Sequence, residues 1–182
     1  MAIFGACFIT PPTLVWFRQD LRLRDNPALT FASEQGSVIP LYIFDTDCPK
    51  HFVPGEASKW WLHHSLTALD DSLNNQLHCL KGDASKILVE FIHQHGIKTV
   101  VWNRCYEPWQ IKRDTQLKQV LTEAGVTVQS FNSHLLWEPW QVLKKDGTPY
   151  KVFTPYYRRG CLSKAAPRIP VGAPSNLLIE YI

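Results

Sequence analysis

The sequence predicts an α/β fold of the doubly wound, Rossmann-like type, in which a parallel sheet carries helices on both faces. Three observations support this prediction. Short apolar runs alternate with longer helical patterns over residues 13–131. The runs are almost continuously apolar, as in strands that are buried on both faces. The length of 182 residues suits one such domain. Right-handed crossovers between parallel strands then place helices on both sides.

The first part of the alternation starts with an apolar run at 14–17, which predicts a strand. The tripeptide at 25–27 offers an asparagine N-cap followed by proline in the first turn, and it therefore predicts a helix, which Gly36 ends. A second strand is predicted at 38–44. A long helix is predicted over 56–75, where four leucines share one face: Leu62, Leu66, Leu69 and Leu73.

The second part contains a strand at 77–81 and a helix at 84–95, which Asp83 caps and Gly96 ends. It continues with a strand at 97–102, and then a helix at 110–124 and a strand at 126–131. Ligands of such sheets bind beyond the carboxyl ends of the strands, near the point where the strand order reverses. Any site is therefore expected in the loops that follow the strands, at residues 18–26, 45–55, 82–83 and 103–109.

Charge divides the chain at about residue 138. Residues 1–138 hold 12 Lys/Arg and 14 Asp/Glu, whereas residues 139–182 hold 7 and 2, so the basic character lies in the tail. Six of the 13 prolines lie there as well. We therefore predict a domain at 13–138 and a Pro-rich basic linker at 139–182, and we leave residues 1–12 unassigned.

Cysteine and histidine spacing predicts no metal site. The five cysteines include no Cys-x-x-Cys pair, and neither histidine pair, at 63–64 and at 93 and 95, places two rings on one helical face. Unpaired cysteines favour a reducing, cytoplasmic setting. The uncharged stretch at 1–17 is too short for a membrane span and lacks the basic start of a secretory signal, so no membrane association is expected.

The loop at 18–26 contains three arginines, two aspartates and an asparagine in nine positions. Such a run forms either a network that fixes the loop or a site for an anion. We predict a network that includes Arg18, Asp20, Arg22 and Asp25. A Gly-x-Gly-x-x-Gly turn and a P-loop are absent from the sequence, so it has no ordinary cradle for a dinucleotide.

The loop at 103–109 is the other dense group of polar and aromatic residues. Its aromatic rings either stack on a planar ligand, with Arg104 and Glu107 as polar anchors, or simply pack the end of the sheet. Cys105 has no partner at a fixed spacing, which favours an inert small residue over a nucleophile. The segment at 150–159 mixes aromatic and basic residues, a pattern found in nucleic-acid contacts and also in arms that dock on their own domain.

Five ordered blocks resemble the DNA photolyase and cryptochrome family, most closely the class I photolyases that repair cyclobutane pyrimidine dimers. The resemblance covers about residues 14–160. The blocks are Leu14 to Asn26, Gly55 to Leu66, Lys81 to Asp83, Trp102 to Trp109 and Tyr150 to Tyr156.

This resemblance implies an N-terminal antenna domain with the strand order 3-2-1-4-5, followed by the start of an interdomain linker. Family members continue into a helical domain that holds FAD, a tryptophan electron chain and the cleft for damaged DNA. Residues for those tasks have no counterpart here, so neither catalytic residues nor DNA repair are expected of this chain alone. Damaged DNA is a partner only through the helical domain. Self-association is expected through the surface that this domain would cover.

The resemblance also implies an antenna chromophore near the loops after strands one, two and four. We assign Arg18 and Arg104 to anionic groups, Asp45 and Glu107 to hydrogen bonds, and Trp109 to stacking, with Cys105 in the same loop. Folate-binding members have Asn-Glu where this chain has Trp109 and Gln110. This departure favours a deazaflavin or FMN over methenyltetrahydrofolate.

Three functions fit the sequence. The first is the light-harvesting domain of a photolyase. The second is a stand-alone nucleotide-binding module of the universal-stress or electron-transfer-flavoprotein type, although the missing phosphate loop counts against it. The third is the structural half of a photolyase whose other domain is a separate polypeptide.

Overall fold

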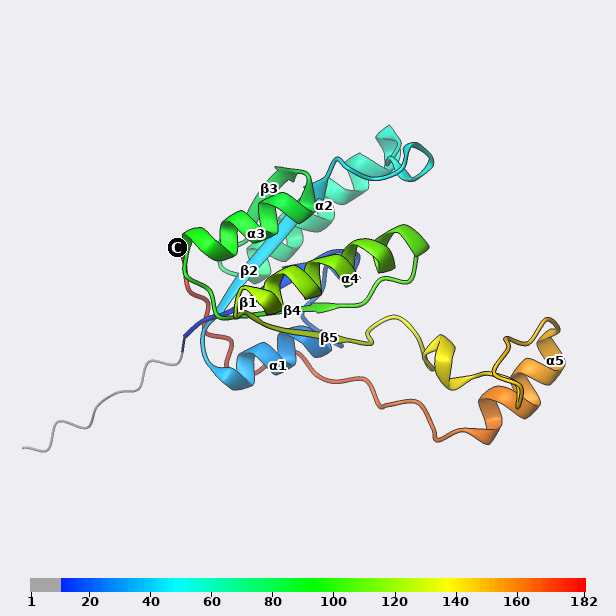
Figure 1. Ribbon diagram of the computed structural model, residues 1–182. Coiled ribbons are helices and arrows are strands. Elements are labelled where there is room, and N and C mark those ends of the chain that lie inside the picture. The colour runs from blue at the N-terminus through cyan, green and yellow to red at the C-terminus, as the bar shows by residue number, and fades with distance from the viewer. Residues whose placement is uncertain (1–10) are drawn as a thin grey trace, which may run out of the picture.

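The computed structural model describes residues 11–182, so most of the unassigned segment at 1–12 lies outside the described residues. Its centre is a parallel sheet of five strands in the order β3-β2-β1-β4-β5, as predicted (Figure 1). Trp16 in the central strand pairs with Leu41 on one side and with Trp102 on the other. The strands are β1 (Thr13–Phe17), β2 (Val38–Asp45), β3 (His78–Gly82), β4 (Thr99–Asn103) and β5 (Thr127–Phe131).

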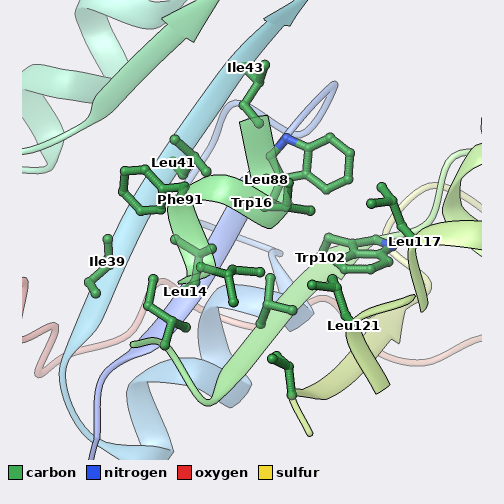
Figure 2. Close-up of a cluster of buried hydrophobic side chains, with 14 of the residues drawn as sticks. Leu14, Trp16, Ile39, Leu41, Ile43, Leu88, Phe91, Trp102, Leu117 and Leu121 are labelled. Atoms are coloured by element: carbon green, nitrogen blue, oxygen red, sulfur yellow. The ribbon is translucent and has the colours of Figure 1, made fainter. Parts of the chain in front are cut away.

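Four helices cover the two faces of the sheet. They are α1 (Pro27–Gln35), α2 (Glu56–Ser72), α3 (Ala84–Gln94) and α4 (Pro108–Glu123). Helices α3 and α4 pack on one face around Trp16 and Trp102 (Figure 2), and α1 and α2 pack on the other around Val15 and Phe17. Successive residues of β1 thus point to opposite faces, which is why its five residues are all buried.

The predicted helix starts are confirmed at two caps. The Asn26 side chain accepts a hydrogen bond from the Leu29 backbone N–H, with Pro27 in the first turn of α1. The Asp83 carboxylate accepts bonds from the backbone N–H groups of Ser85 and Lys86 at the start of α3. Both helices therefore begin at the carboxyl end of a strand, where the sheet also carries its polar loops.

Two elements are more exposed than their sequence predicts. In α2 only the end of the leucine stripe is fully buried, at Leu69 and Leu73, and Trp60 and Trp61 face solvent. Strand β3 is largely exposed, because it lies at the edge of the sheet and has a single neighbour. Length and apolar content do not distinguish an edge strand from a central one.

The tail forms a separate lobe and then returns to the sheet. Its short turns are η2 (Pro139–Gln141), α5 (Phe153–Pro155), η3 (Tyr156–Gly160) and η4 (Cys161–Ser163), and in Figure 1 this lobe projects away from the sheet. The chain then runs back along α1, and the backbone of Val38 bonds to Leu178 and Glu180. The end of the predicted linker thus packs on the domain that it was expected to leave.

Within residues 11–182 no helix has the length and apolar character needed to cross a membrane.

Candidate functional site

A cavity of about 190 Å³ lies at the carboxyl end of the sheet, over β1 and β2. The loop after β2, which contains the short turn η1 (Lys50–Phe52), and the first turns of α4 complete its wall. This position agrees with the expectation that a ligand lies beyond the strands where their order reverses. The main lining residues are Trp16, Arg18, Tyr42, Asp45, Phe52, Leu62, Trp109, Gln110 and Arg113.

A chain of ion pairs holds the base of this cavity. Arg18 Nη1 lies 2.6 Å from Asp114 Oδ2, and Arg113 lies 2.6 Å from Asp45 Oδ2 and 3.0 Å from Asp114 Oδ1. All four side chains are at least 85% buried. Two guanidinium groups therefore face two carboxylates, so the base of the cavity is polar without a net charge.

Aromatic rings form the other surfaces of the cavity. The Arg113 guanidinium lies 5.0 Å from the ring centroid of Trp16 and 5.1 Å from that of Trp109. Phe52 packs against Trp109 with ring centroids 5.9 Å apart. These flat, weakly polar surfaces suit a planar ligand.

Four polar atoms of this wall are buried without a hydrogen-bond partner among the described residues. They are Trp16 Nε1, Trp109 Nε1, Arg18 Nε and Gln110 Oε1. An unsatisfied buried donor or acceptor costs about 1–3 kcal/mol, so a cluster of four is rare where it serves only stability. Three donors and one acceptor indicate a ligand that brings several acceptors and one donor.

The structure brings together three of the six residues assigned from the sequence. Arg18, Asp45 and Trp109 line the cavity, whereas Arg104 does not. Arg104 Nε donates to Glu138 Oε1 at 3.0 Å, and its Nη1 donates to the carbonyl oxygen of Ser130. Its guanidinium is therefore part of the contact between the loop after β4 and the lobe.

Cys105 and Glu107 also lie outside this cavity. Burial raises the pKa of the Cys105 thiol to about 11, so the sulfur stays protonated and inert. Glu107 precedes α4 and accepts a hydrogen bond of 3.3 Å from Gln19 Nε2 near the surface. Both side chains follow β4 but face a neighbouring hollow, because the chain turns there into α4.

Sequence reasoning missed Arg113, which lies between two tryptophan rings and pairs with two aspartates. One signal was present, because Arg113 follows Trp109 by four residues and so shares its helical face. Gln110 had been noted only as a departure from the family pattern. Its burial beside the cavity makes it a candidate ligand contact.

The polar loop after β1 forms contacts among its own residues, and its charged side chains also bond to residues outside the loop. Asp20 is 1% exposed and accepts bonds from the Arg18 backbone N–H and from the side-chain amides of Asn26 and Asn103. The carboxylate of Asp25 lies 2.5 Å from Arg168 in the tail. The Arg22 side chain donates to the Asp25 and Ser133 carbonyl oxygens and to Ser133 Oγ. Local contacts and partners distant in the sequence thus fix this loop together.

The described residues contain no group of three or more His, Cys, Asp and Glu side chains that would hold a metal ion.

A doubly wound sheet with an aromatic and polar cavity beyond its strands defines an α/β domain of the cofactor-binding class. The comparisons then identify the family. Residues 13–175 match the family described as DNA photolyase, and the chain belongs to this family. Its curated relatives include photolyases and cryptochromes. Family membership argues against a module of the universal-stress or electron-transfer-flavoprotein type.

Three relatives illustrate the match. The deoxyribodipyrimidine photo-lyase of Agrobacterium fabrum is 45% identical over 172 residues, which are 92% of this chain and 35% of that protein. The crystal structure of a class III photolyase from Agrobacterium tumefaciens has a TM-score of 0.87 and 42% identity, covering 100% of this chain and 38% of that one. The structure of an archaeal photolyase from Sulfolobus tokodaii is described with two FAD molecules and the implication of a novel light-harvesting cofactor. It has a TM-score of 0.74 and 28% identity, covering 92% of this chain and 38% of that one.

The chain therefore spans about a third of the length of that curated photolyase. Its resemblance to class I in particular is not confirmed, and one of the similar structures is a class III photolyase.

Proposed function

We propose that this chain is a light-harvesting domain that holds a planar antenna chromophore in the cavity over β1 and β2. The observation that carries the proposal is the cluster of four unsatisfied polar atoms between aromatic walls. A bound ring system would pair these atoms and keep water from them. The solved photolyase from Sulfolobus tokodaii, described with two FAD molecules and the implication of a novel light-harvesting cofactor, supports the same role.

The chemistry of Gln110 favours a flavin or deazaflavin over a folate. The pyrimidine edge of a flavin offers an N–H donor between two carbonyl acceptors, which matches the acceptor and donor groups of one primary amide. The pterin edge of a folate instead offers two adjacent donors, which match a carboxylate. Gln110 supplies the amide, and its Oε1 has no other partner among the described residues.

The charges in the cavity favour binding of the chromophore with its ring system inside and its phosphate outside. Arg18 and Arg113 both face the cavity, yet each is already paired with a carboxylate. An inserted phosphate would have to break one of these buried pairs, which leaves an uncompensated charge. We therefore place the ring of a deazaflavin or FMN inside and any phosphate at the mouth.

The chain's own residues bind and orient the ring. The Trp16 and Trp109 indole N–H groups and Arg18 Nε are available to its acceptors, and Gln110 Oε1 is available to its donor. Phe52 and Leu62 shield it from water. When bound, the chromophore supplies light absorption and passes the energy onward.

The activity of a longer protein is a further proposal. We propose that FAD and damaged DNA bind to a helical domain carried by the same or another polypeptide, and that this chain alone repairs no DNA. Exposed apolar side chains such as Phe153 and Leu162 favour contact with that domain or self-association. We propose a cytoplasmic location.

Titration of the chain with a deazaflavin, FMN and methenyltetrahydrofolate, followed by fluorescence, tests the proposal. We expect the deazaflavin to bind most tightly and folate most weakly, with modest affinities because the cavity is open on one side. Trp109→Ala should weaken binding at least about tenfold, and Trp140→Ala, in the lobe, should not. The absence of binding by all three compounds would overturn the proposal.

A further inference from the structure

A second cavity of about 190 Å³ lies between the first three turns of α4, the end of β4 and the loop that follows it. Asp114, Thr115 and Lys118 face it from one side of α4, and Trp102 and Tyr106 face it from β4 and its loop. The aromatic ring of Trp140 borders it from the lobe. This cavity is distinct from the proposed chromophore site, because the two cavities have no lining residue in common. They are linked only by ion pairs, in which Asp114 of this cavity pairs with Arg18 and Arg113 of the other.

Lys118 carries a positive charge that forms no ion pair in the described part of the chain. Its ammonium group is half-buried and donates one hydrogen bond of 2.7 Å to Ser130 Oγ. No carboxylate of residues 11–182 lies within 4 Å of Lys118 Nζ. An ammonium group has three donors, so further bonding capacity remains.

The two carboxylates closest to this region are already engaged. Asp114 pairs with Arg18 and Arg113, and Glu138 pairs with Arg104 and accepts a bond from the Tyr106 hydroxyl. The other ionisable groups of the cavity are neutral, because burial raises the pKa of Cys105 to about 11 and that of Tyr106 to about 12. Lys118 is therefore a cation of this cavity that no carboxylate within 4 Å pairs with.

A second unsatisfied donor lies in the same cavity. Trp102 is fully buried, and its Nε1–H has no acceptor among the described residues. Lys118 Nζ lies 5.9 Å from the Trp102 ring centroid, and both residues line this cavity. Burial and the neighbouring Arg104 lower the pKa of Lys118, and the Asp114 carboxylate offsets this only in part.

We infer that this cavity binds a small oxyanion, the chemistry of a phosphate group, with Lys118 as its countercharge and Trp102 Nε1–H as a second donor. The anion would supply the acceptors that both donors lack and would pair with the Lys118 ammonium group. The inference does not depend on the proposed antenna function, since no chromophore takes part in it.

The test uses the full chain without chromophore and titrates inorganic phosphate and, separately, AMP at constant ionic strength. The two arms distinguish a free anion from the phosphate group of a larger ligand. Nuclear magnetic resonance follows the indole N–H signal of Trp102, which Trp102→Phe identifies. We expect this signal to shift on saturation with at least one of the two compounds.

Three variants make the result specific. Lys118→Met should weaken binding at least about tenfold and Lys118→Arg should retain most of it, whereas Lys112→Met, an exposed change on the same helix, should leave it unchanged. Lys118→Met should also melt no lower than wild type without phosphate, because it removes a desolvated cation. Equal affinity of Lys118→Met and wild type, or no binding in either arm, would overturn the inference.

Discussion

The two ends of the parallel sheet differ in how many of their buried polar groups are paired. At the amino end, β2 pairs with β3 only from Leu41 onward, so Val38 has no partner in β3. The returning tail bonds to the backbone N–H and to the C=O of Val38 instead. Leu177 and Ile179 of the tail pack on the core there, and Tyr181 stacks on His78. Among the described residues, five buried side-chain donors and acceptors stay unpaired around two cavities at the carboxyl end, against one at the amino end, His78 Nε2. The closed end indicates stability, and the open end indicates binding.

The largest effect is expected from a buried polar group at the carboxyl end that does have partners. Asp20→Asn should lower the free energy of unfolding by about 2 kcal/mol, because an amide nitrogen would face the donors of Arg18, Asn26 and Asn103. Denaturant unfolding measures this loss. The exposed Lys50→Gln is the control, and equal stability of the two variants would show that the Asp20 contacts carry little energy.

The closed amino end gives the next effect. Ile179→Asp should destabilise the domain by about 1–2 kcal/mol, because it places a charge in the packed contact between the tail and α1. Ile169→Asp, at a position that is 84% exposed, should change stability by less than about 0.5 kcal/mol. If both variants unfold at the same denaturant concentration, the tail does not close the sheet.

At the open end, a substitution should change ligand preference more than stability. Gln110→Glu supplies the carboxylate that a pterin edge requires, so the ratio of folate to deazaflavin affinity should rise about tenfold, equivalent to about 1.4 kcal/mol. Gln116→Glu, exposed on the same helix, is the matched control. An unchanged ratio would remove Gln110 from the chromophore contacts.

The smallest effect is expected from pH, at the contact of Asp25 with the tail. The hydrogen bond from Arg168 lowers the pKa of Asp25 below its ordinary value of 3.8. The stabilisation is therefore complete above pH 3.8 and is lost as the pH falls through the lowered value.

Because this pair is partly exposed, its contribution should be only a few tenths of a kcal/mol. Wild type should lose that much more stability than Arg168→Gln between pH 5 and pH 2. Arg158→Gln should behave as wild type, and an identical pH dependence in all three would show that the ion pair contributes nothing.

The sequence predicted the elements well because their signals are local. The caps at Asn26 and Asp83 and the apolar strand at 14–17 depend on neighbouring residues, and the structure confirms them. The strand order required the family resemblance, since periodicity does not state which strands are neighbours.

The candidate site was predicted only in part, because its partners are distant in the sequence. Arg18 pairs with Asp114, 96 residues away, and Arg104 pairs with Glu138, 34 residues away. The loop positions and the family resemblance predicted both arginines as anchors but did not indicate that one faces the cavity and the other faces the lobe. The return of the tail to Val38 gave no local signal either, because proline content resembles that of a linker.

The most direct test of the open carboxyl end is nuclear magnetic resonance of the indole N–H groups during titration with a deazaflavin. Single Trp→Phe variants assign the signals of Trp16, Trp109 and Trp102. The first two line the proposed chromophore cavity, and Trp102 lines the other one. We expect the Trp16 and Trp109 signals to shift with the same dissociation constant while the Trp102 signal stays in place. Saturable binding that leaves Trp16 and Trp109 unshifted would contradict the account.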